Sequence, residues 1–282
     1  MPKDIRPPIS EPMQREVRQR FGFCCAICGE MPTEIHHIVE YSIRKQHEVD
    51  NLILLCDRHH KEVSSGRLSR TQVLSAWAYP YCSSGRPARY SFLHSEQKQV
   101  HIASSKFIVQ EGGTVFLFDL DDQNWLSFRL LRGIPLFSMS LYGSSSQEHV
   151  EIVDNVFSFP PIGLFDIRLK GKKLTVNLQK RKKLLEIRFD QGAMFIEKLK
   201  ACGDEGAVRI ENNQMSIFGQ YEKLEVNATI RNNFVFVPTN HTLTYLGRSN
   251  NPFQCMVRLP KESRLQRKEA WKWLFRRERK AI

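Results

Sequence analysis

The chain has 282 residues, of which 41% are hydrophobic and 26% charged, and its formal net charge is +12. A chain of this length exceeds the usual size of one hydrophobic core, so two domains are expected. The sequence has no run of about 18 apolar residues, which excludes a membrane-spanning helix, and its N-terminus lacks the apolar core of a signal peptide. We therefore expect a cytoplasmic protein with no membrane partner.

Cysteine usage indicates metal binding rather than a disulfide framework. The chain has seven cysteines, an odd number, and four of them fall at positions 24, 25, 28 and 56. Five of the nine histidines lie in the same part of the sequence, between residues 36 and 60. Such bunching is typical of reduced thiols and metal ligands.

The positive charge is concentrated outside this cysteine- and histidine-rich part. Residues 1–80 have a net charge of +1, residues 81–258 a net charge of +5, and the last 24 residues a net charge of +6. A basic surplus predicts a polyanion partner, because phosphate neutralisation supplies most non-specific affinity for nucleic acids. A basic protein kept soluble by its charge is the alternative.

Residues 1–80 are predicted to form short helices and strands separated by polar turns. A helix is expected over 11–21, because Ser10 suits the N-cap and Gly22 suits the end. The next elements are a cysteine knuckle over 24–30, a strand over 33–39, a polar loop over 40–50, an apolar run over 51–56 that becomes helical by residue 63, and a helix from Ser69 to about Trp77.

The composition and the hydrophobic patterning of the sequence change after residue 80. Residues 81–100 are rich in Ser, Gly and Pro and are predicted to form a linker. Residues 101–282 contain short β-branched and aromatic runs between Gly, Asn and Pro, which is typical of a sandwich or barrel, and 261–280 is predicted to be a basic helix. The expected fold class is α+β, with a small N-terminal domain over 1–80 and a larger, mainly β domain.

Two ligand pairs have the spacing of a zinc knuckle. Cys25 and Cys28 form a CxxC pair, and Cys56 and His59 repeat this spacing further along the chain. Four such ligands suit a tetrahedral Zn²⁺ site. Cys24 competes with Cys25, which is preferred because it alone has two residues before Cys28. The alternative is that the two pairs arise by chance in a reducing cytosol.

Four further polar residues are left outside the zinc set, namely His36, His37, Asn51 and His60. Neighbouring residues of a helix diverge by about 100°, so His59 and His60 cannot face the same metal. The two histidines at 36 and 37 lie on the strand between the knuckles, so the fold brings them close to His60. Two imidazoles could hold a divalent cation while a third accepts a proton from water near neutral pH.

The order CxxCG, HHI and NLxxLCxxHH resembles the HNH endonuclease family over about residues 12–66. The resemblance implies a ββα-metal fold with a structural Zn²⁺ and a catalytic Mg²⁺ or Mn²⁺. It implies these active-site roles: His37 as general base, His36 and His60 as ligands of the catalytic metal, and Asn51 as the residue that orients the base. It also implies these structural zinc ligands: Cys25, Cys28, Cys56 and His59, with a fourth Cys more common in the family than His59.

Two features of the sequence do not follow directly from this family pattern. Adjacent residues on a strand face opposite ways, so His36 and His37 need a bend or a strand end to converge. Some family members have another histidine four residues after the position of His60, where this chain has Ser64. Water and phosphate oxygens would then complete the coordination. His47, in the polar loop, is expected to be a surface residue.

The implied activity is metal-assisted hydrolysis of DNA phosphodiester bonds, in which His37 deprotonates a water and the cation stabilises the charge on the phosphate. Five basic residues are candidates for binding the phosphates of the DNA backbone: Arg44, Lys45, Arg58, Lys61 and Arg67. For each of them a solvated surface position is an equally good explanation.

The β domain is expected to decide which DNA is cut. In a restriction-type or anti-phage enzyme it would select target DNA, with the basic run over 170–183 and the C-terminal helix holding phosphates. In a defence effector it would instead sense a regulatory ligand or protein partner. A third hypothesis is a non-catalytic, zinc-stabilised DNA-binding module. A homodimer would be natural if both strands are cut.

Overall fold

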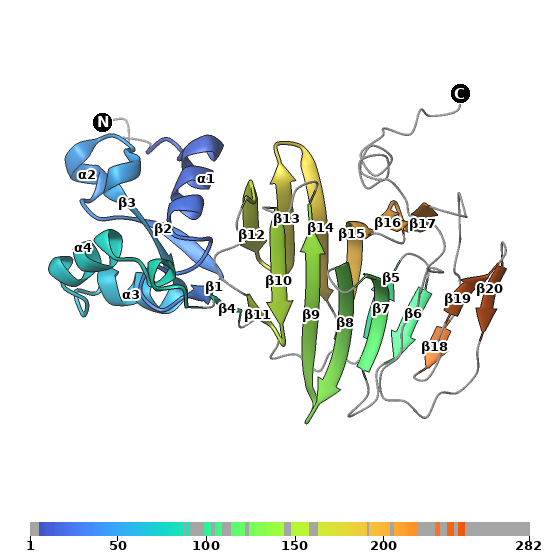
Figure 1. The fold of residues 1–282 in the computed structure, drawn as a ribbon. Helices are drawn as coiled ribbons and strands as arrows, with labels where there is room; N and C mark the ends of the chain where they lie inside the picture. The colour runs from blue at the N-terminus through green and yellow to red at the C-terminus, as the bar shows by residue number, and fades with distance from the viewer. Residues whose placement is uncertain are drawn as a thin grey trace.

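The computed structural model describes residues 6–86, 88–90, 99–102, 105–108, 114–121, 124–143, 148–157, 163–190, 192–203, 206–218, 229–231, 236–239 and 242–245. Figure 1 shows a helix-containing N-terminal part beside a larger part built from strands. Among the described residues, no helix has the length and apolarity needed to cross a membrane. The predicted basic helix over 261–280 lies outside them.

The N-terminal part consists of helices and short strands. Its elements are α1 (Glu11–Arg20), β1 (Glu30–Met31), β2 (Thr33–His37), α2 (Tyr41–Arg44), η1 (Val49–Asn51), β3 (Leu52–Cys56), α3 (Asp57–Ser64), α4 (Arg70–Ala78) and η2 (Tyr81–Ser84), where η denotes a 3-10 helix. The predicted helices over 11–21 and from Ser69 are confirmed as α1 and α4. Ser69 caps α4, because its side chain accepts a hydrogen bond from the backbone N–H of Gln72.

The antiparallel pair β2–β3 forms the scaffold of the N-terminal part. Thr33 pairs with Cys56 at one end, and His37 pairs with Leu52 at the other. All five residues of β3 are buried, in one core with Val17 of α1 and Val73 of α4. A strand covered on both faces needs a continuous apolar run, which explains why β3 does not alternate.

Two larger sheets make up the rest of the described structure. The seven-stranded sheet has the order β1-β4-β11-β10-β9-β8-β7. Beyond β1 its strands are β4 (Ala88–Tyr90), β7 (Thr114–Asp121), β8 (Asn124–Leu131), β9 (Ile134–Tyr142), β10 (His149–Val153) and β11 (Val156–Phe157). From β7 to β11 the order follows the chain, as expected for strands joined by short hairpins.

The nine-stranded sheet has the path β12-β13-β14-β15-β5-β6-β18, and β16 and β17 extend it from β15. Its strands are β5 (Gln99–Ile102), β6 (Ser105–Ile108), β12 (Asp166–Lys170), β13 (Lys173–Gln179), β14 (Lys182–Asp190), β15 (Ala193–Gly203), β16 (Gly206–Glu211), β17 (Gln214–Phe218) and β18 (Thr229–Arg231). A separate antiparallel pair consists of β19 (Phe236–Thr239) and β20 (Thr242–Tyr245).

One core joins the two large sheets. It contains Phe128 and Phe137 from the seven-stranded sheet together with Leu174 and Ile187 from the nine-stranded sheet. The sheets therefore pack face to face, as Figure 1 shows for β8 to β10 in front of β13 to β15. Burial alternates along β13, as period-2 patterning predicts for a strand with one buried face.

The N-terminal part is fastened to the sheets at a seam between α1 and β12. Arg18 of α1 forms a bidentate ion pair with Asp166 of β12, with Nε–Oδ1 and Nη2–Oδ2 distances of 2.8 Å. The two side chains are only 9% and 8% exposed. Beside them, Glu11 pairs with Arg168, and β1 pairs with β4. The domain division at residues 81–100 stays a prediction; this stretch contains η2, β4 and the start of β5.

Replacing Arg18 with Met is expected to lower the free energy of unfolding by about 3 kcal/mol, because it leaves the buried Asp166 carboxylate without its bidentate partner. The double variant Arg18→Met/Asp166→Leu should recover most of this loss. Urea denaturation measures both. The control is Arg44→Met, which removes an exposed ion pair with Glu48 and should cost less than about 1 kcal/mol. Equal effects of Arg18→Met and Arg44→Met would contradict a buried seam.

Candidate active site and metal centre

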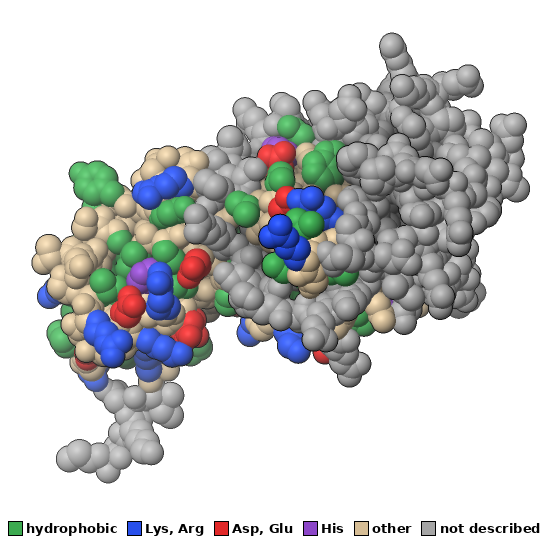
Figure 2. All heavy atoms as spheres, turned by 90° about the horizontal axis from the view of Figure 1, so that it is seen from below, with side chains coloured by type: hydrophobic (Ala, Val, Ile, Leu, Met, Phe, Trp, Pro, Cys, Tyr) green, Lys and Arg blue, Asp and Glu red, His purple; other side chains and the backbone are tan. Residues whose placement is uncertain are grey.

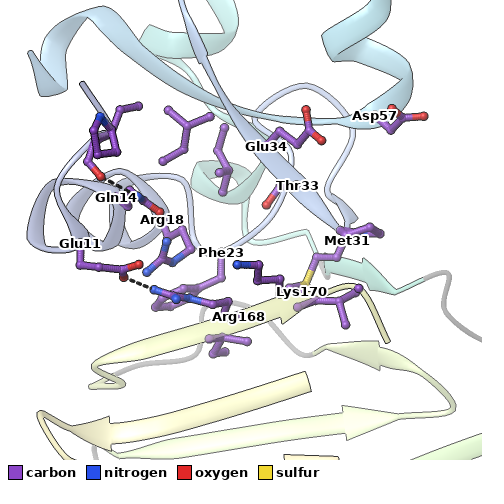
Figure 3. A pocket seen from close by; sticks show the side chains of 18 of the residues that line it. Glu11, Gln14, Arg18, Phe23, Met31, Thr33, Glu34, Asp57, Arg168 and Lys170 are labelled. Carbon is purple, nitrogen blue, oxygen red and sulfur yellow. Dashed lines mark hydrogen bonds and ion pairs between the residues drawn. The ribbon is translucent and has the colours of Figure 1, made fainter. Parts of the chain in front are cut away.

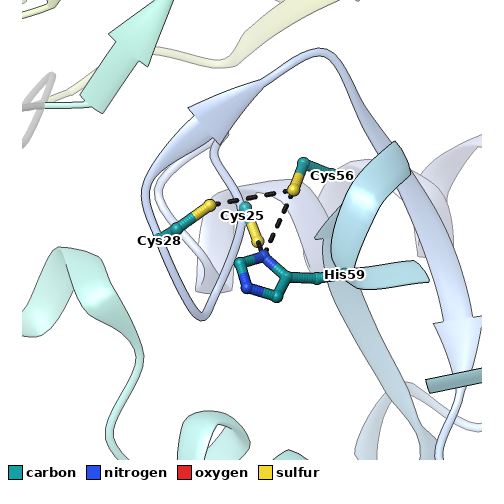
Figure 4. Close-up of side chains that lie close together, drawn as sticks. All are labelled: Cys25, Cys28, Cys56 and His59. Carbon is teal, nitrogen blue, oxygen red and sulfur yellow. Dashed lines mark hydrogen bonds between the residues drawn. The ribbon is translucent and has the colours of Figure 1, made fainter. Parts of the chain in front are cut away.

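Three cysteines and one histidine converge at the base of α3 (Figure 4). Cys25 and Cys28 lie in the turn between α1 and β1, Cys56 ends β3, and His59 lies in the first turn of α3. Their ligand atoms all lie within 4.8 Å of one another. The cluster contains all four residues predicted as structural metal ligands.

The spacing of these atoms fits a tetrahedral metal ion. The Sγ atoms of Cys28 and Cys56 are 3.7 Å apart, and His59 Nδ1 lies 3.5 Å from Cys25 Sγ and 3.3 Å from Cys56 Sγ. In a tetrahedron, zinc–sulfur bonds of about 2.3 Å and zinc–nitrogen bonds of about 2.0 Å require a sulfur–sulfur separation of roughly 3.8 Å and a sulfur–nitrogen separation of roughly 3.5 Å. A structural metal ion can therefore be held here with small adjustments.

The structure distinguishes Cys25 from its neighbour Cys24. The Sγ atom of Cys25 lies among the other three ligand atoms, and hydrogen bonds from the Cys28 and Cys56 side chains lower the pKa of Cys25, which favours the thiolate that a metal needs. Burial raises the pKa of Cys24, so that side chain remains a thiol. Cys24 belongs to the core shared by the two large sheets, whereas Cys25 belongs to the core of the N-terminal part.

A second cluster lies around the end of β2. His36 and His37 of β2 and His60 of α3 line one cavity of about 480 Å³. The rings of His36 and His60 are perpendicular, with centroids 5.0 Å apart. The expected divergence of adjacent helix residues is thus observed, because His59 joins the cysteines and His60 faces this histidine cavity. The other residues lining the histidine cavity are Arg6, Ile35, Glu40, Tyr41, Ser42 and Lys45.

His36 and His37 both reach the histidine cavity because β2 ends at His37. His36 turns towards His60, whereas His37 is buried with its ring against those of Tyr41 and His47. The strand end that the sequence required for two adjacent histidines is therefore present.

Both ring nitrogens of His37 have polar partners. Arg6 Nη2 lies 2.8 Å from Nδ1, and His47 Nδ1 lies 3.0 Å from Nε2. Burial, the charge of Arg6 and the neighbouring His47 together lower the pKa of His37 to about 4. The ring is consequently neutral at pH 7 and keeps a lone pair that can accept a proton.

Asn51 fixes the chain immediately after β2. It is buried, its Oδ1 accepts a hydrogen bond from the Val39 N–H, and its Nδ2 donates one to the Val39 carbonyl, both at 2.8 Å. Its own carbonyl accepts from the Ile38 N–H at 2.9 Å. These bonds join the loop after His37 to the start of β3.

Ser64 stands where some members of the HNH family have a further histidine ligand. Its hydroxyl donates to the backbone carbonyl of His60 at 2.8 Å, within the last turn of α3. A carboxylate does lie close to His60, because Glu34 Oε2 is 3.8 Å from its Nδ1. This carboxylate comes from β2, the strand that also carries His36.

The predicted phosphate-gripping residues are not gathered at one place. Lys45 lines the histidine cavity, Arg44 pairs with Glu48 and Lys61 with Asp57, and Arg58 lies beside His59. Arg67 is exposed beyond the end of α3. On the face shown in Figure 2, acidic and basic side chains are mixed over the N-terminal part.

The basic run over 170–183 is also partly neutralised. Lys173 pairs with Glu197 at 2.7 Å and with Glu186 at 3.3 Å, and Lys183 pairs with Glu186 as well. Among its lysines and arginines, those at the turn between β13 and β14 are exposed. Lys170 and Lys172, at the turn between β12 and β13, are exposed as well, so any phosphate contact from this run would come from these two turns.

A larger cavity of about 750 Å³ lies at the seam, between α1, β2 and β12 (Figure 3). Its floor includes Phe23 and Met31, and its charged lining includes the Glu11–Arg168 ion pair. Neither the cysteines nor the histidines described above line it. The three histidines thus line the smaller cavity and not this one.

Residues 25–66 match the family model described as HNH endonuclease. This part of the chain is an HNH segment. It spans β1 to α3 and contains the metal cluster and the three histidines. The predicted resemblance is thereby confirmed. No curated protein and no solved structure matches the chain.

Three residues around His37 were missed by the sequence reasoning: Arg6, Tyr41 and His47. Arg6 and Tyr41 line the histidine cavity, and Arg6 and His47 bond to His37. His47, expected to be a surface residue, is partly buried, and its ring bonds to His37 on one side and to the Pro7 carbonyl on the other. The HNH segment contains Tyr41 and His47, but no ligand spacing marks either of them.

Proposed function

We propose that the HNH segment hydrolyses phosphodiester bonds in DNA. The observation that carries this proposal is the convergence of His36, His37 and His60 from two elements in one cavity, next to a separate metal cluster. A structural cluster needs no open cavity, whereas a catalytic site needs room for a substrate and a water. The pair β2–β3 followed by α3 supports a ββα-metal fold, and the facing sheets support a β-sandwich.

His37 is the general base of this proposal. It is neutral at pH 7, and one of its ring nitrogens faces Arg6 on the wall of the histidine cavity. Arg6 would have to leave that nitrogen before a water could use it. A phosphate entering the cavity would attract the guanidinium away, because Arg binds phosphate through several charge-assisted hydrogen bonds.

His36 and His60 are the proposed ligands of a divalent cation. Their perpendicular rings and the nearby Glu34 carboxylate offer the mixed nitrogen and oxygen donors that suit Mn²⁺, and Mg²⁺ with water. When bound, the cation would stabilise the negative charge that develops on the phosphate and the departing oxygen. Asn51 orients the base through the loop after β2, and Lys45 contributes positive charge to the phosphate.

The metal cluster is proposed to hold Zn²⁺ in a structural role, and the sheets are proposed to select the target DNA, as in a restriction-type or anti-phage enzyme. The support for target selection is the basic surplus of the chain outside residues 1–80. DNA affinity that falls steeply with salt is the expected consequence of that surplus.

The test is cleavage of supercoiled plasmid and of modified phage DNA by the full-length protein. Mg²⁺ or Mn²⁺ should support nicking or linearisation, and brief EDTA treatment should abolish it. Elemental analysis after the EDTA step must show that zinc remains bound, so that the loss is assigned to the catalytic cation. Re-addition of Mn²⁺ should restore cleavage. Tight binding with no cleavage of any substrate in either metal would instead favour a non-catalytic binding module.

A further inference from the structure

His47 bonds to the proposed base on one side and to the N-terminal segment on the other. Its Nδ1 lies 3.0 Å from His37 Nε2, and its Nε2 lies 2.8 Å from the backbone carbonyl oxygen of Pro7. At the far end, Arg6 Nη2 lies 2.8 Å from His37 Nδ1. A chain of three hydrogen bonds therefore starts and ends on adjacent residues, Arg6 and Pro7.

The groups at the two ends of this series of hydrogen bonds determine which atom donates and which accepts in each bond. A guanidinium only donates hydrogen bonds, and a backbone carbonyl only accepts them. His37 Nδ1 must therefore accept from Arg6, so a neutral His37 has its proton on Nε2 and donates to His47 Nδ1. His47 in turn has its proton on Nε2 and donates to Pro7. Each other neutral tautomer would leave two donors or two acceptors facing each other.

We propose that His47 is a positioning residue of the active site, which holds His37 in the tautomer whose Nδ1 lone pair faces Arg6 and the histidine cavity. The inference rests on the proposed function, because it takes His37 as the general base. A base is effective when its free lone pair is aimed at the water, and the hydrogen bond at the other ring nitrogen sets which lone pair is free.

Once Arg6 has left Nδ1, as the proposed mechanism requires, His47 is the residue that holds the tautomer of His37. Tyr41 contacts the His37 ring edge-on, with centroids 6.0 Å apart, and His36 is turned to His60. Among the described residues, His47 is the hydrogen-bond partner of His37 Nε2. Its own ring lies on Tyr41 at 4.8 Å between centroids, which restricts its rotation.

The loop that presents His47 is itself constrained. Arg44 and Gln46 both bond to the Glu48 carboxylate, and η1 follows directly and ends at the buried Asn51. The backbone of Lys45 is left-handed, with φ of 58°, and turns the chain at the end of α2. These contacts hold the loop in place from both sides of His47.

Steady-state cleavage by the full-length protein tests the proposal. His47→Ala is expected to lower kcat by about 10- to 100-fold with KM changed less than about twofold, the usual cost of losing a group that orients a functional histidine. His47→Gln should recover most of kcat, because its amide can accept from His37 and donate to Pro7. Ile43→Ala, an exposed neighbour in α2 that does not line the histidine cavity, is the matched control and should keep wild-type kcat. A His47→Ala enzyme with wild-type kcat, or a His47→Gln enzyme as slow as His47→Ala, would overturn the proposal.

A spectroscopic readout separates this inference from the proposed function. In protein labelled with ¹⁵N-histidine, two-bond ¹H–¹⁵N correlations distinguish the two neutral tautomers of each ring. His37 should be the Nε2–H tautomer in the wild type, in Arg6→Ala and in Arg6→Ala/His47→Gln, and a mixture in Arg6→Ala/His47→Ala, where both ring nitrogens have lost their partners. This result is expected even if no DNA is cleaved, in which case only the nuclease proposal fails. An unchanged His37 tautomer in Arg6→Ala/His47→Ala would overturn the role of His47.

Discussion

Replacing His37 with alanine should lower the rate of DNA cleavage by about 10²- to 10⁴-fold, the usual contribution of a positioned general base. The reason is the place of His37 at the end of β2, where it is buried, neutral at pH 7 and open to the histidine cavity on the side of Arg6. Substrate binding should change little, because phosphate affinity comes from the cationic residues around the cavity. Single-turnover cleavage of a labelled duplex measures the rate, and a binding titration in Ca²⁺ measures the affinity.

Two further variants separate the base from the cation. His60→Ala should abolish cleavage and also weaken Mn²⁺ binding, which electron paramagnetic resonance can follow, whereas His37→Ala should keep Mn²⁺ binding. His149→Gln alters a half-buried histidine of β10 that does not line the histidine cavity, and it should cleave at the wild-type rate. A His37→Ala protein that cleaves as fast as the wild type would rule out His37 as the base.

Replacing Cys56 with serine should release the structural metal and unfold the N-terminal part. Apparent binding free energies of structural zinc are about 10 to 16 kcal/mol in small zinc domains, which is comparable with the whole stability of a domain. Cys56 links the cluster to the fold more directly than the other ligands, because it ends β3 and immediately precedes α3. Elemental analysis should fall from one zinc per chain to nearly none, and proteolysis should cut within residues 24–60.

Cys24→Ala is the matched control for this loss. Cys24 is adjacent to a ligand and fully buried, yet its side chain belongs to the other core, so the variant should keep one zinc per chain. His59→Cys should also keep the metal, because a fourth thiolate preserves tetrahedral coordination. If Cys56→Ser retains one zinc per chain, the four-residue cluster does not hold it.

Features encoded by short spacings were predictable from the sequence. The interval of two residues between Cys25 and Cys28, and between Cys56 and His59, is set by local turns, so it identified the cluster without the fold. The helical offset between His59 and His60 likewise separated the metal cluster from the histidine cavity. The short β-branched runs predicted the strands, because alternation reflects one buried face.

By itself, then, the sequence determined the HNH segment, the four residues of the metal cluster and the order of helices and strands in the N-terminal part, because each depends on residues a few positions apart. Only the tertiary structure decided which distant side chains meet. It placed Arg6 and His47 on His37, buried Arg18 against Asp166, and ordered the strands of the two sheets. Such contacts join segments far apart in the chain, and their partners are selected by packing and by the need to pair buried polar groups, which leaves no periodic signal.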